Sequence, residues 1–233
     1  CDNQVGEESG ELDMVIAIDT SGSIRGAEQD QMRDGVNAFI NALPTDGSVR
    51  VGTITFGNNA ISQLQGLDTP DNLSVTLPSF SGNTPLPAAL DIADQLVRTD
   101  PTARAGAQKT VVLFTDGGPN YENETYAANG YDAPRDDTAD WSAVAGDSTY
   151  DSADTTNATV TEAEMDETAI VADSVRAQTT RVATVFIGED DSTDAMTGDA
   201  IAAYGNLPTY LADAIASPGF SFTVDFADLD ALA

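Results

Sequence analysis

A group of oxygen-bearing residues follows the first apolar segment of the chain. Residues 14–18 are all apolar and predict a buried strand, and the sequence Asp-Thr-Ser-Gly-Ser occupies positions 19–23 directly after them. An amphipathic helical pattern comes next, so this turn lies where a strand ends and a helix is about to begin. In open α/β sheets, ligands bind outside the carboxyl ends of the strands. One carboxylate and two hydroxyls at that position favour a hard divalent cation as the ligand.

Two later segments carry candidate partners for this turn. Thr84 precedes a Pro-Leu pair that opens a helical pattern, and Asp116 ends an apolar strand-like segment and is followed by two glycines. In this order and in these local settings, the three segments resemble the von Willebrand factor type A (VWA) domain, also called the integrin I-like domain. The resemblance extends from residue 12 to the end of the chain. It implies a metal-ion-dependent adhesion site formed by Asp19, Ser21, Ser23, Thr84 and Asp116.

The resemblance also implies a function. Mg²⁺ is the expected cation, with Ca²⁺ and Mn²⁺ as alternatives, and an acidic side chain of a protein partner completes its coordination. This predicts a cell-surface adhesion or protein-binding module. The alternative is a structural subunit of a homopolymeric surface assembly or filament, in which copies of the chain are the partners.

Each predicted site residue also has a simpler interpretation. Asp19 and Asp116 could cap helices, and Ser21 and Ser23 could serve as ordinary turn residues. Thr84 is well placed to cap the helix that begins with the following proline. Five such coincidences at one sheet edge are harder to accept than a metal site, and we therefore favour the metal site.

The residue inventory argues against an enzyme. The chain has no histidine, which removes His-based triads and His general acid–base pairs. It has no Gly-x-Ser-x-Gly motif, and its only cysteine is Cys1. An aspartyl phosphotransferase would be expected to have a second Asp two residues after Asp19, where this chain has Ser21. We therefore expect a binding protein without catalytic residues.

The charge balance is strongly acidic. The 233 residues include 39 Asp and Glu against 9 Lys and Arg, which gives a formal net charge of −30. Such acidity is common in disordered chains, but 41% of these residues are hydrophobic and follow strand and helix periods. We interpret the chain as one folded domain with a solvated acidic surface, as in halophilic organisms. Nucleic acid is not an expected partner, since no basic patch is present to bind phosphates.

The start of the sequence suggests a surface protein. Cys1 followed by a polar segment resembles a mature lipoprotein, with the lipid on Cys1 and residues 1–11 as a tether; the alternative is that the chain begins at Cys by coincidence. No apolar stretch of about 18 residues predicts a membrane-spanning helix, so membrane contact is expected only through Cys1. We expect an extracellular, lipid-anchored domain at the cell surface. Candidate glycosylation sites are Asn72, Asn123 and Asn157.

The remaining pattern predicts a doubly wound α/β domain at 12–233, with a mostly parallel central sheet, one antiparallel edge strand and helices on both faces. An acidic insertion at 117–161 contains aromatic residues that suit either packing against the domain or partner contact. A shorter insertion at 189–206 opens with three acidic residues, which belong either to the acidic surface or to a second cation site. The predicted strands are 12–19, 49–56, 60–64, 109–116, 181–188 and 220–226, and the predicted helices are 27–43, 85–98, 162–178, 208–217 and 227–232.

Overall fold

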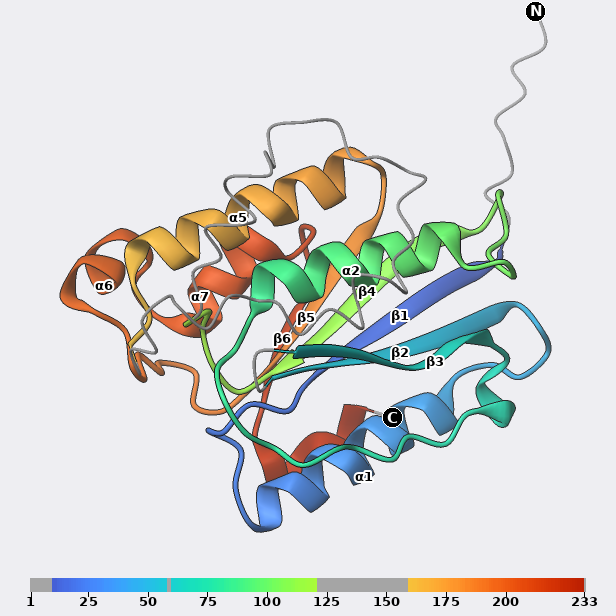
Figure 1. The fold of residues 1–233 in the computed structure, drawn as a ribbon, viewed down its shortest axis with the longest axis horizontal. Coiled ribbons are helices and arrows are strands. Elements are labelled where there is room, and N and C mark those ends of the chain that lie inside the picture. Colours follow the sequence, from blue (N-terminus) through green and yellow to red (C-terminus); the bar gives the residue numbers. More distant parts are fainter. Residues whose placement is uncertain (1–9, 58–59, 121–158, 233) are drawn as a thin grey trace, which may run out of the picture.

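The strands form one central sheet with helices on both faces (Figure 1). The computed structural model describes residues 10–57, 60–120 and 159–232. Within these ranges the sheet has six strands in the order β3-β2-β1-β4-β5-β6, and every neighbouring pair is parallel except β2 and β3. The predicted fold class is therefore confirmed. The strands are β1 (Leu12–Asp19), β2 (Val49–Gly57), β3 (Ala60–Asp68), β4 (Gln108–Thr115), β5 (Arg181–Ile187) and β6 (Ser221–Val224).

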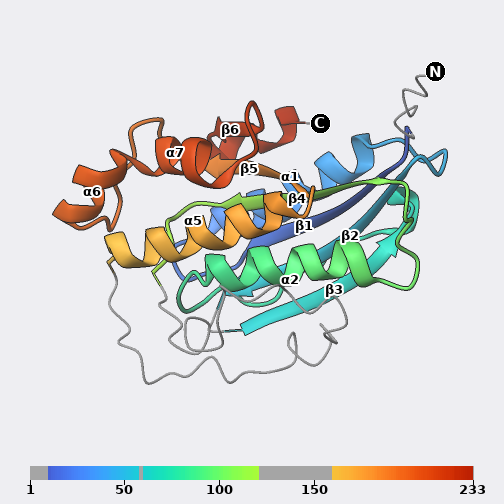
Figure 2. The ribbon, with the colours of Figure 1, turned by 90° about the horizontal axis from the view of Figure 1, so that it is seen from above.

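Two layers of helices enclose the sheet. The helix α1 and the last 3₁₀ helix cover one face, and α2 and α5 lie side by side over the other (Figures 1 and 2). The described helices are α1 (Ala27–Ala42), α2 (Leu86–Thr99), α5 (Glu162–Ala177), α6 (Gly198–Tyr204) and α7 (Leu207–Tyr210), with a π-helical turn at Leu211–Ile215 and 3₁₀ helices at Pro70–Asn72 and Phe226–Leu232.

The strand β1 is apolar on both of its faces, and this places it at the centre. Ile16 and Ile18 pack into the layer under α1, while Val15 and Ala17 pack into the layer under α2. All four side chains are fully buried. A strand that is covered on both sides appears in the sequence as a continuous apolar run without alternation, which is what residues 14–18 show.

The order of the strands creates a switch point beside β1. The chain builds β2 and β3 on one side of β1, then crosses through α2 and builds β4, β5 and β6 on the other side. β1 and β4 are parallel neighbours, and Ile18 pairs with Phe114 near their carboxyl ends. Connections therefore leave these two strands in opposite directions, and α/β proteins bind ligands at such switch points.

Several predicted elements differ in detail from the structure. β3 continues to Asp68, beyond the predicted end at residue 64, and the predicted insertion at 189–206 contains α6. The helix α6 forms because the Thr197 side chain caps its start and Gly205, with a φ of 78°, ends it. The predicted helix at 208–217 is α7 followed by the π-helical turn, and the final helix is 3₁₀. Most of the long insertion, residues 121–158, lies outside the described residues.

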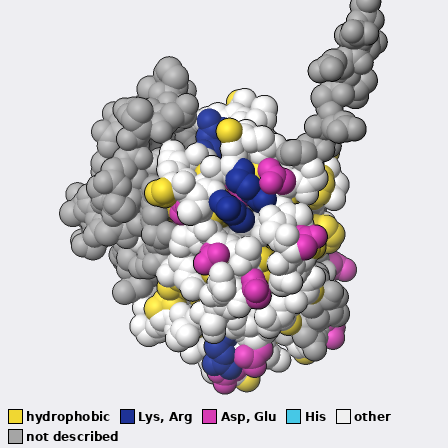
Figure 3. Space-filling view, turned by 90° about the vertical axis from the view of Figure 1, so that its right-hand side faces the viewer, with side chains coloured by type: hydrophobic (Ala, Val, Ile, Leu, Met, Phe, Trp, Pro, Cys, Tyr) yellow, Lys and Arg dark blue, Asp and Glu magenta, His cyan; other side chains and the backbone are white. Residues whose placement is uncertain are grey.

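An ion cluster joins the amino ends of β1 and β4. Asp13 is fully buried, and its two carboxylate oxygens lie 2.6 Å from Lys109 Nζ and 2.8 Å from an Arg104 Nη. Burial by itself raises the pKa of Asp13, but the hydrogen bonds from Lys109 and Arg104 outweigh it and leave this pKa below its ordinary value. Figure 3 shows basic side chains gathered beside acidic ones on the side of the molecule where β1 begins.

We expect the Asp13→Asn variant to lower the free energy of unfolding by about 3 kcal/mol, because it leaves two cations without their buried partner. Chemical denaturation in molar KCl measures the loss. The matched control is Asp30→Asn on the exposed face of α1, where Asp30 pairs with Arg33 and the expected change is within about 0.5 kcal/mol. Equal losses in the two variants would show that the cluster does not stabilise the fold.

Candidate functional site

The carboxylate of Asp19 is held in one orientation at the end of β1. The backbone amide of Ser21 donates to Asp19 Oδ1 at 2.8 Å, and the hydroxyl of Thr115 at the end of β4 donates to Oδ2 at 2.7 Å. Asp19 is fully buried. The bond from the Ser21 amide is a turn contact, so the interpretation of Ser21 as an ordinary turn residue was partly right. The capping interpretation of Asp19 was wrong, because Gly26 precedes α1 and no side chain caps that helix.

A chain of hydrogen bonds links this turn to the next strand. The Ser21 and Ser23 hydroxyl oxygens are 2.9 Å apart, and the Ser23 hydroxyl donates to Asp116 Oδ1 at 2.8 Å. Ser21 is buried and Ser23 is exposed, so the chain runs from the interior to the surface. Four of the five predicted residues are therefore connected: Asp19, Ser21, Ser23 and Asp116.

The fifth predicted residue, Thr84, lies on a loop that is bound to this turn through its backbone. The Ser81 amide donates to the Thr20 carbonyl at 2.9 Å, and the Gly22 amide donates to the Gly82 carbonyl at 3.0 Å. The Thr84 amide in turn donates to Asn120 Oδ1 at 2.6 Å, which connects the loop to the segment after β4. Three separate segments thus meet at one edge of the sheet.

The structure corrects the capping role expected for Thr84. The helix α2 begins at Leu86, and the residue in the capping position is Pro85, which has no side-chain acceptor. Thr84 lies one residue too early to cap, and its carbonyl instead accepts from the Leu86 amide at 2.9 Å. Its side chain is buried, and its hydroxyl makes no hydrogen bond to another described residue.

Close backbone contact fixes the turn against β2. Both the amide and the hydroxyl of Thr20 donate to the Phe56 carbonyl, at 2.7 and 3.0 Å. Gly57 follows with a φ of 150°, and a Cβ there would lie 2.7 Å from the Thr20 carbonyl atoms. Only glycine allows this approach. Sequence reasoning missed the roles of Thr115, Gly57 and Asn120; the one available signal was Thr115 directly before Asp116.

The two carboxylates of the site disfavour each other's ionisation. Burial raises the pKa of Asp19 to about 6, although the hydrogen bonds from Ser21 and Thr115 oppose this rise. Burial and then the charge of Asp19 raise the pKa of Asp116 to about 8, against the hydrogen bond from Ser23. Without a positive charge between them, Asp116 retains its proton near neutral pH, whereas Asp19 loses its proton only above about pH 6.

The donor set suits a hard cation that keeps part of its water shell. It offers two carboxylates and the hydroxyls of two serines, with the Thr84 hydroxyl on the adjoining loop. Across the described ranges, no group of three or more Asp, Glu, Cys or His side chains is placed to hold a metal ion. Two carboxylates are the number by which Mg²⁺ is typically held together with several waters.

The other predicted sites are peripheral or outside the described residues. Asn72 is exposed, and its amide donates to Asp68 Oδ1 at 3.0 Å. The three acidic residues that open the segment after β5, at 189–191, are exposed. No helix within the described residues is long and apolar enough to cross a membrane. Cys1, Asn123 and Asn157 lie outside the described residues, as do the aromatic residues of 121–158.

The sequence profile of the von Willebrand factor type A domain matches residues 13–198. A comparison with curated protein sequences finds no match. The profile includes all five predicted site residues and all strands except β6.

Solved structures share the fold at low sequence identity. The pilus adhesin SpaC from Lactobacillus rhamnosus GG has a TM-score of 0.65 and 20% identity over 95% of this chain and 29% of its own. The manganese-loaded TRAP protein of Plasmodium vivax has a TM-score of 0.54 and 19% identity over 96% and 72%. Proximal thread matrix protein 1 from the mussel byssus was solved with a zinc-occupied MIDAS motif, the metal-ion-dependent adhesion site. It has a TM-score of 0.59 and 17% identity over 95% of this chain and 46% of its own. The chain thus spans less than half of SpaC and of the thread matrix protein.

The raised pKa values predict how stability depends on pH in the presence of a chelator. Both carboxyl groups have higher pKa values in the folded than in the unfolded state, so the folded state binds more protons between about pH 4 and pH 8. We therefore expect the free energy of unfolding to fall as the pH rises from 5.5 to 8, as measured by chemical denaturation in molar KCl with EDTA.

The Asp116→Asn variant should lose most of this pH dependence, because one of the two interacting charges is removed. The matched control, Asp30→Asn, should retain it, since Asp30 is exposed on α1. An unchanged pH slope in Asp116→Asn would contradict the proposed coupling of the two carboxylates.

Proposed function

Because the chain belongs to the von Willebrand factor type A family, we propose that it is a protein-binding module that recognises an acidic side chain of its partner through a bound divalent cation. The observation that carries this proposal is the hydrogen-bonded series from Asp19 through Ser21 and Ser23 to Asp116. It joins the carboxyl ends of two adjacent parallel strands, where ligands of α/β proteins bind.

The proposed cation is Mg²⁺, held by Asp19, Ser21, Ser23, Thr84 and Asp116, either directly or through water. When bound, it offsets the charge of the two carboxylates and leaves a coordination position for a carboxylate oxygen of the partner. The buried Asp19 is already oriented by Ser21 and Thr115, so little side-chain freedom remains to be lost on binding. Likeness to a manganese-loaded protein and to one with a zinc-occupied MIDAS motif supports a divalent cation.

The proposed setting is the surface of a halophilic cell. Likeness to the pilus adhesin SpaC supports an adhesive role outside the cell, and the net charge of −30 supports a high-salt environment. A lipid on Cys1 would provide the anchor. The partner is proposed to be a protein.

Ser23→Ala should weaken Mg²⁺ or Mn²⁺ binding about tenfold or more, because it removes a proposed ligand and the hydrogen bond that orients Asp116. Calorimetric titration of metal-free protein in molar KCl measures the affinity. Ser23 is exposed, so the variant is expected to fold. Asp19→Asn should abolish saturable binding.

The matched control is Ser79→Ala, which changes an exposed serine in the loop before Thr84. It should bind the cation like the wild type. Binding that is equally tight in Ser23→Ala and in the wild type would contradict the assignment of the site.

Partner binding should be tighter in 2 M KCl than in 0.1 M KCl. An acidic ligand is repelled by a chain of net charge −30, and the distance over which this repulsion acts falls from about 10 Å at 0.1 M salt to about 3 Å at 1 M salt. The direct contact between cation and carboxylate survives this screening. Fluorescence anisotropy with an aspartate-containing peptide and saturating Mn²⁺ measures the effect, and circular dichroism at both salt concentrations controls for unfolding. Equal or tighter binding at low salt would contradict the prediction.

A further inference from the structure

Basic side chains are unevenly distributed over the two edges of the sheet. In a parallel α/β fold, strands begin and helices end at the amino edge of the sheet, opposite the candidate site. Most of the described basic residues lie in these positions. They are Arg50, Lys109 and Arg181 at strand starts, Arg98 and Arg176 in the last turns of helices, and Arg104 in the loop before β4.

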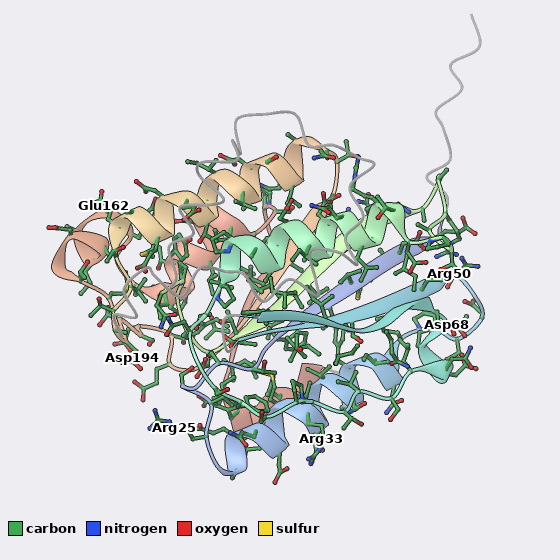
Figure 4. The ribbon with its side chains drawn as sticks, in the orientation of Figure 1. Arg25, Arg33, Arg50, Asp68, Glu162 and Asp194 are labelled. Atoms are coloured by element: carbon green, nitrogen blue, oxygen red, sulfur yellow. The ribbon has the colours of Figure 1, made fainter. Side chains whose placement is uncertain are left out.

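Arg25 differs from these residues in its position. It belongs to the turn between β1 and α1, at the carboxyl edge, and it is exposed. Figure 4 shows its side chain projecting away from the ribbon at that end of the molecule. Arg33, in the second turn of α1, is the other described basic residue toward this edge, and it is paired with Asp30 and Asp34.

The Arg25 side chain is attached to the candidate site itself. Its Nε donates to the carbonyl of Gly22 at 2.8 Å, and Gly22 lies between the two predicted serine ligands. The Arg25 amide also donates to Glu28 Oε2 at 2.9 Å, and the Glu28 carboxylate is near enough to contribute to the raised pKa of Asp116. The guanidinium group is therefore held at the rim of the site by the same turn that supplies the hydroxyls.

The outer part of this guanidinium has no charged partner within the part of the chain that the structure describes. Among the described residues, Arg25 forms no salt bridge, and its Nη atoms donate no hydrogen bond. With Nε bound to a carbonyl, the two Nη groups still present a planar pair of donors that matches a carboxylate. Arg25 thus places a positive charge at the rim of the candidate site, in a chain that has 39 acidic residues.

We propose that Arg25 binds a second carboxylate of the partner, next to the carboxylate that coordinates the cation. The inference rests on the proposed function and deepens it, because it specifies the partner segment as one with two nearby acidic groups. The cation binds one carboxylate, and Arg25 selects segments that carry the other. Arg25 is a specificity residue in this scheme and is not a ligand of the cation.

Short fluorescent peptides of glycine and serine test this proposal. One peptide carries a single aspartate, and a series carries a second aspartate one to four residues away. Fluorescence anisotropy in molar KCl with saturating Mn²⁺ gives the affinities, and a parallel titration with EDTA measures binding without the cation. The proteins are the wild type, Arg25→Gln, Arg25→Lys, and Arg33→Gln as a matched control that removes the same charge from α1.

We expect the wild type to bind its preferred two-aspartate peptide about three to ten times more tightly than the single-aspartate peptide. Arg25→Gln should lose this preference while it still saturates with Mn²⁺ and binds the single-aspartate peptide. Arg25→Lys should retain part of the preference, because an ammonium keeps the charge but not the planar donor pair. Arg33→Gln should behave as the wild type.

The inference is overturned if the wild type shows no preference for a second aspartate, if Arg25→Gln keeps the preference, or if Arg33→Gln loses it to the same extent. A different result would reject the proposed function as well: no wild-type peptide binding, or binding that is unchanged by EDTA. The wild-type titrations thus separate failure of the cation-mediated mechanism from failure of the Arg25 assignment.

Discussion

Two carboxylates share the carboxyl ends of β1 and β4, and no described basic side chain forms a hydrogen bond or salt bridge with either one. Asp19 is held by the Ser21 amide and the Thr115 hydroxyl, and Asp116 is held by the Ser23 hydroxyl. These donors orient the carboxylates but supply no positive charge, which is why burial raises both pKa values. A divalent cation is the simplest group that would offset both charges.

The opposite end of β1 shows how this fold treats a buried carboxylate that has only a structural role. Asp13, also fully buried, is surrounded by Arg104 and Lys109, and its pKa is lowered. The same strand therefore carries one carboxylate with its cations built into the fold and one without them. This difference within a single strand is a physical reason to interpret Asp13 as structural and Asp19 as functional.

The acidic composition gives the site its electrostatic setting. Among the described residues, basic side chains are concentrated at the amino edge, and those toward the carboxyl edge are Arg25 and Arg33, of which Arg33 is paired with Asp30 and Asp34. In dilute salt such a surface attracts cations and repels acidic partners. In molar salt the long-range repulsion is screened, while contacts at a few ångströms remain. The composition and the proposed cation-mediated recognition are thus compatible under the same conditions.

The sequence by itself determined the fold class, because continuous apolar runs and amphipathic segments alternate along the chain. It also placed Asp19, Ser21, Ser23 and Asp116 at the ends of recognisable strands, and the resemblance to the von Willebrand factor type A domain predicted these four residues and Thr84 as a metal site. Only the tertiary structure decided how these residues interact. The support from Thr115, Asn120 and Gly57 comes from neighbouring strands and loops, and the only local signal for it was the position of Thr115 directly before Asp116. The structure also shows that Thr84 does not cap α2. The residue in the capping position is Pro85, and this start of the helix depends on backbone geometry that residue types alone did not reveal.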